Sequence, residues 1–388
     1  MGAMRRAPVA LAALAAAALA CHSGPDCTCG PGLTCADSPE GGVCMTPPMQ
    51  PMTRHPGPTL ANMEVWICVW DGDEAFGQDV NLFVSRLFAS DYYRTNMAEY
   101  GASGGVSKGV LRLGAPPASS DFSRYEAAIA SLPGKMTYAG ETFDAPNENT
   151  VVLFVVPGQT MTDEGIYHYE TAPGVVQAAM HVPYIVLPRN LIGPDFDELT
   201  WSASHEIVEV ASDPHPTTFP AWYDNLLTYL GEIADLCNDI PTTQTLDGTP
   251  YVLTRIYSAS RAAARAGDPC VPALDRPFAG VALSPLSLAI PENGSLRVGT
   301  LEVHAFSYGP PSPMTWYIDF YPTNVYSAAP ATGTIVPGES VSIVVTRDAD
   351  PGFELPVFAR VALYDPADPF ARIPVQEAFG AVLTFTGR

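Results

Sequence analysis

The chain has 388 residues, and its 41 acidic residues outnumber the 19 lysines and arginines, which gives a formal net charge of −22 at pH 7. A surface this acidic repels phosphate groups, so nucleic acid is excluded as a partner and anionic lipid headgroups are disfavoured. The length is too great for one ordinary core, so we expect several domains, and the 8 cysteines indicate an oxidising compartment.

Residues 1–20 have the pattern of a secretory signal peptide. Two arginines precede an Ala/Leu-rich run that is too short for a comfortable membrane span. The run ends in Ala-Leu-Ala before Cys21, which resembles the cleavage site of a bacterial lipoprotein and would make Cys21 the lipidated first residue. The same letters also satisfy ordinary secretion. We therefore expect an exported protein that is either anchored to the outer membrane or cell surface through this lipid, or secreted.

Residues 21–45 form a Cys-rich segment, and residues 46–62 form a Pro-rich one. After Cys21 the first segment holds Cys27, Cys29, Cys35 and Cys44. Almost nothing else there could form a core, so we expect two disulfides with three pairings open, and a zinc knuckle as the alternative. The second segment lacks apolar periodicity, which is typical of a stiff linker. Together they predict a stalk.

Residues 63–274 alternate strand-like apolar runs with helical patterns, which predicts an α+β domain with one mixed sheet. The expected strands are 64–70, 105–113, 150–156 and 179–187. The expected helices are 80–89, 92–100, 122–132 and 194–212. Cys237 and Cys270 are the natural remaining disulfide pair, which leaves Cys68 as a buried free thiol.

The helix expected over 194–212 carries the most informative motif of the chain. Pro214 disfavours helical geometry at Asp213, so the helix should end just before that residue. An apolar stripe at helical spacing predicts one buried face. His205 and Glu209, four residues apart, lie together off that stripe, with Glu206 beside them.

This motif resembles the H-E-x-x-H helix of metallopeptidases, with a carboxylate in place of the second imidazole. In that helix the two outer side chains bind zinc and the intervening Glu is the general base. By this resemblance His205 and Glu209 are metal ligands and Glu206 is catalytic. Zn²⁺ is the expected ion, while the second carboxylate leaves Ca²⁺ or Mn²⁺ open. The alternative is a surface helix in which His205 and Glu209 share only a hydrogen bond.

A third ligand is required, and the segment 231–237 offers two acidic residues. In gluzincin-type metallopeptidases a second helix supplies a Glu ligand and, one turn later, an Asp that orients a ligating His. By that resemblance we expect Glu232 as the third ligand and Asp235 behind it, with the roles exchanged as the open alternative. A Cys237–Cys270 bridge would hold this element in place. Asp213 is a weaker candidate.

Two upstream histidines and one aromatic pair are further candidates for the site. In zincin-like folds a strand that borders the cleft lies just before the active-site helix, and residues 181–187 occupy that place. His168 and His181 are candidate ligands, although an ordinary hydrogen-bonded histidine is the commoner case. Trp222 and Tyr223 could line a pocket or pack in the core.

Residues 275–388 consist of strands and Pro/Gly/Asn-rich turns, which predicts an immunoglobulin-like β-sandwich. The expected strands are 281–290, 295–306, 314–321, 340–346, 357–364 and 378–386. No Cys-Trp-Cys signature is present, so this description concerns architecture only. We expect the domain to act as a spacer or in adhesion.

Residues 64–272 also resemble the phosphate-induced, Exordium-like secreted proteins and their bacterial relatives. The resemblance rests on Val65-Trp66, Gly-Ile-Tyr-His at 165–168, Pro-Tyr-Ile-Val at 183–186, the helix motif and its continuation over 204–214, and Glu-Ile-Ala-Asp-Leu-Cys at 232–237. It implies an extracellular protein with a zincin-like core.

Together these patterns predict a surface-anchored or secreted metal-dependent hydrolase, most simply a peptidase acting on peptide or protein substrates. Two ligating carboxylates weaken the cation as a Lewis acid, so we expect slower hydrolysis than in a standard zincin, or none. The alternatives are an inactive binding or adhesion lipoprotein with a degenerate or structural metal site, and a purely structural lipoprotein.

Overall fold

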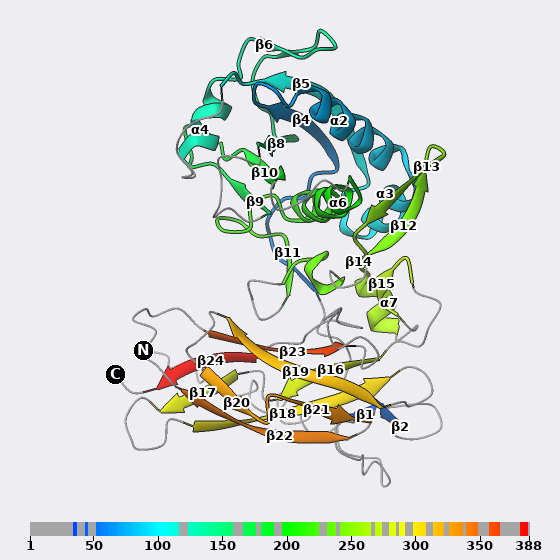
Figure 1. The fold of residues 1–388 in the computed structure, drawn as a ribbon, viewed down its shortest axis with the longest axis vertical. Helices are drawn as coiled ribbons and strands as arrows, with labels where there is room; N and C mark the ends of the chain where they lie inside the picture. The colour runs from blue at the N-terminus through cyan, green and yellow to red at the C-terminus, as the bar shows by residue number, and fades with distance from the viewer. Residues whose placement is uncertain are drawn as a thin grey trace, which may run out of the picture.

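The computed structural model describes residues 34–36, 43–45, 52–115, 123–157, 166–175, 180–189, 196–224, 231–237, 241–264, 268–273, 279–284, 287–291, 298–307, 313–321, 326–336, 339–347, 357–364 and 381–386. The expected signal peptide, Cys21, Cys27 and Cys29 lie outside these residues. Figure 1 shows a mixed α/β part, from Met52 to about residue 273, and an all-β part that follows it. Among the helices described here, none combines the length and the apolar character that crossing a membrane requires.

The N-terminal segments contain two short described elements, and the second belongs to the α/β part. A short hairpin of β1 (Thr34–Ala36) and β2 (Val43–Met45) places Cys35 opposite Cys44. The expected linker, however, already belongs to the α/β part from Met52 onward, because β3 (Met52–Arg54) pairs with β11 (Trp222–Asp224). Met52 and Leu60 are buried in the core. Prolines separate these two buried apolar residues, so they form no regular apolar pattern that would predict a strand or a helix.

The α/β part is built on a five-stranded sheet with the strand order β5-β4-β8-β10-β9. Its members are β4 (Asn62–Val69), β5 (Gly104–Arg112), β8 (Thr150–Val156), β9 (Tyr167–Glu170) and β10 (Pro183–Pro188). The first three strands and β10 run parallel, whereas β9 is antiparallel and lies at the edge. The mixed sheet was predicted correctly. The strand β9 was not predicted, because four residues with two tyrosines and two polar side chains give no apolar run.

Both faces of this sheet are covered, which explains the continuous apolar runs of its inner strands. Along β4, Val65 and Ile67 belong to one core cluster, whereas Trp66 and Cys68 belong to the other. This alternation follows from the two-residue period of a strand. Cys68 is a buried free thiol, as expected, and burial raises its pKa above the usual value.

Five helices of the α/β part are described: α2 (Glu74–Ala89), α3 (Asp91–Met97), α4 (Ser123–Ala130), α6 (Phe196–Ser212) and α7 (Ala259–Ala264), with the 3₁₀ turns η1 (Ala98–Tyr100) and η2 (Asp235–Cys237). Helix α2 packs on β4 and β5, and α6 contacts β10. Ser90 caps α3 by accepting a hydrogen bond from the backbone N–H of Tyr93 at 3.1 Å.

Three small ladders complete the α/β part: β6 (Lys135–Met136) with β7 (Thr142–Phe143), β12 (Thr242–Leu246) with β13 (Thr249–Leu253), and β14 (Ile256–Tyr257) with β15 (Cys270–Val271). The hairpin β12–β13 turns at Asp247 and Gly248, which have positive φ angles of 48° and 76°. An Asp-Gly pair is the typical signal for such a turn. This hairpin was not among the expected elements. Strand β13 packs on α6.

The expected disulfide between Cys237 and Cys270 is present and joins η2 to β15, with 5.6 Å between its Cα atoms. It closes a loop of 33 residues, and loop-closure entropy for that length corresponds to roughly 3–4 kcal/mol of stabilisation. The segment 231–237 is not the second α-helix expected for the ligands. Glu232 lies in a turn, and Asp235 begins the short 3₁₀ turn η2.

The C-terminal part consists of two sheets, with the strand orders β16-β18-β22-β20 and β17-β24-β23-β19-β21. The strands are β16 (Ala279–Ser284), β17 (Ser287–Pro291), β18 (Val298–Ser307), β19 (Met314–Tyr321), β20 (Tyr326–Ala329), β21 (Thr332–Ile335), β22 (Ser340–Arg347), β23 (Val357–Tyr364) and β24 (Ala381–Thr386). The single strand expected over 281–290 is two strands, one in each sheet. Strands β20 and β21 were not expected.

Candidate metal centre

Helix α6 presents the motif to a pocket, and most of the helix beyond its exposed first turn is buried. From Leu199 to Ser212, every residue except Trp201 and Ser202 is buried. Polar side chains secure its position: Thr200 Oγ1 donates to Val252 O at 2.8 Å, and Ser204 Oγ accepts from Thr254 N at 2.9 Å. Because both contacts reach the segment that includes β13, the hairpin fixes the rotation of α6 and therefore the direction of the motif.

The motif side chains line a pocket of about 510 Å³. Its walls come from α6, from strand β9 and from the chain between residues 216 and 235. The lining includes Tyr167, His168, Trp201, His205, Glu206, Glu209, Tyr223, Glu232 and Asp235. The expectation that residues 181–187 border the cleft is therefore wrong. The bordering strand is β9, because β10 lies one position further inside the sheet.

One group of ligand atoms is formed by His205, Glu209 and Asp235. His205 Nε2 lies 3.1 Å from Glu209 Oε1 and 3.5 Å from Asp235 Oδ1. The backbone N–H of Asp235 also donates to Glu209 Oε1 at 3.0 Å, which ties η2 to the helix. These three side chains offer atoms that all lie within 4.8 Å of one another.

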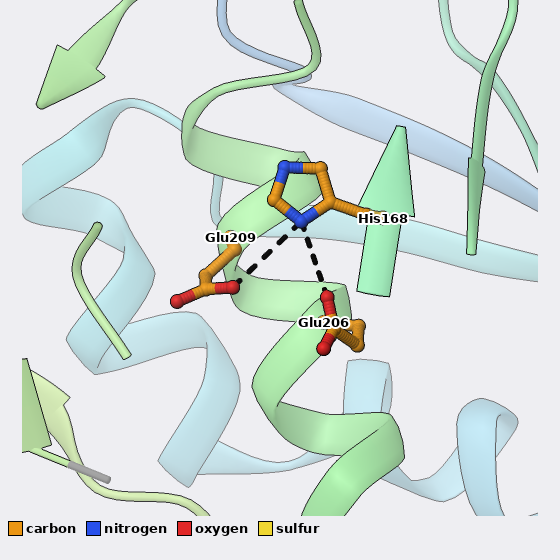
Figure 2. A group of neighbouring side chains, drawn as sticks. All are labelled: His168, Glu206 and Glu209. Carbon is orange, nitrogen blue, oxygen red and sulfur yellow. Dashed lines mark hydrogen bonds and ion pairs between the residues drawn. The ribbon is translucent and has the colours of Figure 1, made fainter. Parts of the chain in front are cut away.

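A second group is formed by His168, Glu206 and Glu209, as Figure 2 shows. His168 extends from β9 toward the helix, and its Nδ1 lies 3.1 Å from Glu206 Oε2 and 3.7 Å from Glu209 Oε2. The other ring nitrogen, Nε2, lies 3.3 Å from Glu232 Oε1 in an ion pair. His168 is thus enclosed by three carboxylates.

The structure redistributes the expected ligand roles. His205 and Glu209 do lie together, with Glu206 facing the same pocket, but the third acid beside His205 is Asp235. Glu232 lies behind His168 instead. The exchange of roles between Glu232 and Asp235, left open from the sequence, therefore describes the geometry better.

The remaining candidates have structural contacts. Asp213 is fully buried and does not line the pocket, and its Oδ1 accepts a hydrogen bond from Ala221 N at 2.8 Å. His181 contacts Thr171 O at 2.9 Å, also outside the pocket lining. Tyr223 does line the pocket, whereas its neighbour Trp222 packs edge-on against Tyr100.

The pocket holds more acidic than basic groups, and this imbalance perturbs their pKa values. Burial lowers the pKa of His205, but Glu209 and Asp235 raise it more, so the net value lies well above normal. His168 behaves in the same way, because Glu232 and Glu206 outweigh burial. The pKa of Glu209 is itself raised well above normal by burial and by Asp235. The pocket therefore has too little positive charge to balance all of its carboxylates.

Around the same pocket, burial and nearby carboxylates act on two further groups. Burial and Glu232 raise the pKa of Asp213 to about 7. Burial, followed by Glu232 and Asp235, raises the pKa of Tyr223 above its usual range. The Tyr223 hydroxyl therefore stays protonated and can act as a hydrogen-bond donor at the pocket wall.

Glu170, at the end of β9, anchors the loop that follows α6. Its Oε1 accepts from Thr217 Oγ1 at 2.7 Å, and its Oε2 lies 2.9 Å from His215 Nδ1. Burial alone would raise the pKa of Glu170, but the hydrogen bonds from His215, Thr217 and Thr218 outweigh it and lower the pKa to about 2. This carboxylate therefore holds the edge strand and the pocket loop together.

Glu170→Gln is expected to destabilise the protein by about 2 kcal/mol at neutral pH. Because the folded-state pKa is depressed, the contribution of Glu170 is fully present above about pH 4.5 and is lost as the pH falls through about 2. Urea unfolding at pH 7 and pH 3 measures this, because four of the five tryptophans lie in the α/β part. A difference between wild type and variant that did not shrink toward low pH would contradict it.

Comparison with known proteins assigns no family to the chain. No family model and no curated protein matches it.

Among solved structures the chain is similar to SSP-19, an MSP-domain protein like family member in Caenorhabditis elegans. The identity is 21% and the TM-score is 0.21, over 26% of this chain and 98% of that chain. The E. coli chaperone DraB has 13% identity and a TM-score of 0.22, over 28% of this chain and 58% of that chain. The PapD-like domain 7 of human CEP192 has 13% identity and a TM-score of 0.21, over 28% of this chain and 86% of that chain. Likenesses at this level assign neither a family nor a function.

Proposed function

We propose that the protein is an exported metal-dependent hydrolase, most simply a peptidase, in which His205, Glu209 and Asp235 hold a divalent cation. The observation that carries this proposal is the convergence of three ligand atoms beside Glu206 in a pocket. Ligand atoms at about 2.0–2.2 Å from a tetrahedral Zn²⁺ lie about 3.3 Å apart. The measured distances of 3.1 and 3.5 Å bracket that value.

The charges of the pocket support a cation as well. Four carboxylates, from Glu206, Glu209, Glu232 and Asp235, face two imidazoles. The raised pKa of Glu209 reflects this imbalance, because an excess of carboxylates over imidazoles makes it costly to keep every carboxylate charged at a largely buried place. A divalent cation removes part of this excess. Zn²⁺ suits a mixed imidazole and carboxylate set, and Mn²⁺ or Ca²⁺ remain alternatives.

The roles of the chain's own residues follow from their positions. A divalent cation bound there would polarise a substrate carbonyl and make a water molecule more acidic. Glu206, beside the ligand group, would take a proton from the attacking water and pass it to the leaving amine. His168 contacts Glu206 Oε2 at 3.1 Å and so fixes the orientation of this carboxylate. Tyr223 can donate to the substrate from the pocket wall.

A zincin-like core as the setting for this chemistry is part of the proposal, and the edge strand of the mixed sheet supports it. The antiparallel strand β9 lies at the sheet edge and lines the pocket beside α6. An extended peptide can add to such an edge through backbone hydrogen bonds, which favours a peptide over a small molecule as substrate. Export, lipidation at Cys21, distant kinship with the Exordium-like proteins and an immunoglobulin-like C-terminal sandwich complete the proposal.

The proposal is tested by metal content and peptide turnover of the purified mature chain. We expect stoichiometric zinc and zinc-dependent cleavage of an unstructured protein such as casein. Asp235→Asn should weaken zinc binding at His205 and Glu209 more than 100-fold, whereas the matched variant Glu232→Gln should change it less than about tenfold, because Glu232 lies behind His168. The reverse order would make Glu232 the ligand. Stoichiometric zinc without turnover would favour a binding protein.

A further inference from the structure

The two carboxylate oxygens of Glu209 face different partners. Oε1 lies 3.1 Å from His205 Nε2, and Oε2 lies 3.7 Å from His168 Nδ1. We propose that His168, Glu206 and Glu209 form a second divalent-cation site, which shares Glu209 with the first site and inhibits hydrolysis when filled. The binding half of this proposal is independent of the enzymatic activity, and the inhibitory half rests on the proposed function.

The donor set of the second site is as complete as that of the first. His168 Nδ1, Glu206 Oε2 and Glu209 Oε2 come from a strand and a helix, and their side chains converge in Figure 2. The ligand atoms lie within 4.8 Å of one another. All three residues are buried, with exposed fractions of 8%, 5% and 2%. One imidazole and two carboxylates are a donor set that Zn²⁺ and Mn²⁺ accept.

The surroundings of His168 provide a second, independent observation. Its Nε2 and Glu232 Oε1 are both buried and, among the described residues, neither has a partner with hydrogen-bond geometry, although they lie 3.3 Å apart. A ligating imidazole usually directs its far N–H at a carboxylate, which fixes the tautomer and frees the near nitrogen for a metal. Glu232 occupies that position behind His168. With Glu232 at ion-pair distance from Nε2, Nδ1 is the ring nitrogen that faces the other two residues of the site.

The charge of the pocket also calls for more than one cation. When both imidazoles are neutral, as ligation requires, the four carboxylates in contact with them carry four negative charges: Glu206, Glu209, Glu232 and Asp235. One divalent cation compensates half of this charge, and two compensate all of it. Since the cost of unbalanced charge rises with burial, the second site should fill at higher metal concentration than the first.

Filling the second site conflicts with the role of Glu206 as a base. The oxygen Glu206 Oε2 would then be engaged by the cation, so the carboxylate would be a much weaker proton acceptor. Hydrolysis should accordingly rise with the first equivalent of zinc and fall with the second. His168 and Glu206 are the ligands that belong to the second site alone, and of these two only His168 is not the proposed base, which makes it the residue to change.

The experiment compares the mature wild-type chain with His168→Asn and with the matched control His181→Asn. His181 contacts Thr171 O and belongs to neither ligand group. Equilibrium dialysis against graded zinc, followed by elemental analysis, should find two ions per chain in wild type and control and one in His168→Asn. The affinity for the second ion should fall at least tenfold in that variant. Excess zinc should inhibit wild type and control but not His168→Asn.

The outcomes separate this inference from the proposed function. One ion per chain in wild type, or two in His168→Asn, overturns the second site. Two ions without inhibition by excess zinc, in a chain that cleaves casein, overturn the inhibitory half alone. Two ions in wild type and one in His168→Asn, with no cleavage at any zinc concentration, support the site and reject the hydrolase. If His168→Asn does not fold, Glu232→Gln keeps every ligand and should still weaken the second ion about 10–100-fold.

Discussion

Glu206→Gln is expected to abolish hydrolysis while the first cation stays bound. Glutamine keeps the size of the side chain and its contact with His168, but it cannot accept a proton from water. General base catalysis contributes about 10²–10⁴-fold, so kcat should fall by that factor. The Glu206 oxygens are not among the three ligand atoms around His205, so binding at that site should change little. Turnover of casein and zinc content, measured on the same preparation, test both halves.

Glu198→Gln is the matched control for this variant. Glu198 lies on the same helix and lines the same pocket, two turns before Glu206, but it belongs to neither ligand group. The control should keep its zinc and most of its activity. Unchanged hydrolysis in Glu206→Gln would remove this residue from the chemistry. Loss of the first zinc together with activity would instead identify Glu206 as a ligand of that ion.

The sequence was sufficient for the elements that carry strong apolar patterns. Strands β4, β8 and β10 were predicted, because each is an apolar run that is almost wholly buried in the sheet. The edge strand β5 was also predicted, although only its residues 109–111 are buried. Helix α6 ends at Ser212 as expected, since Pro214 disfavours its continuation. Cys68 and the Cys237–Cys270 bridge followed from counting the cysteines that lie outside the N-terminal segment. These features depend on local composition and hardly on tertiary detail.

The sequence named His168 as a candidate ligand but could not place its side chain, because that placement depends on strand pairing. His168 reaches the helix only since β9 pairs antiparallel with β10, with His168 opposite Ile185. A shift of one residue would turn His168 away from the pocket and bring a tyrosine in its place. Its alternation with Glu170 on the buried face was the one available signal. A four-residue strand does not rise above chance in one sequence.

The first choice of Glu232 as third ligand, with Asp235 as the open alternative, relied on an expected helix. A helix would place Glu232 and Asp235 on one face, and the resemblance to gluzincins relied on that geometry. In the turn that is present, Glu232 points to His168 while the backbone of Asp235 donates to Glu209. The disulfide at Cys237 constrains this turn. Glu232 therefore contacts the imidazole of His168, whereas Asp235 contacts that of His205.

His205→Ala should have the largest effect on metal binding, because it removes the only nitrogen ligand of the first site. Losing a direct ligand should weaken zinc binding there by more than 100-fold, beyond the range of about 10–100-fold that is typical for residues behind the ligands. In wild type, zinc at 1,000 times its dissociation constant should stabilise the fold by about 4 kcal/mol. The variant should lose that gain. Urea unfolding with and without zinc measures it, and the control His181→Ala should keep the zinc-dependent gain of wild type.

In the absence of zinc, His205→Ala should also be less stable than wild type. This comparison separates the effect of the lost positive charge from the effect of the lost metal. Without a cation, the imidazolium of His205 is the counter-charge for Glu209 and Asp235, which lie 3.1 and 3.5 Å from its Nε2 and raise its pKa. Removing it leaves buried carboxylates unpaired, at a cost of about 3 kcal/mol. Adding Glu209→Gln to His205→Ala should recover part of that stability, since one unpaired charge disappears, but none of the zinc binding. If the double variant were no more stable than His205→Ala, charge repulsion would not be the force that makes this pocket require a cation.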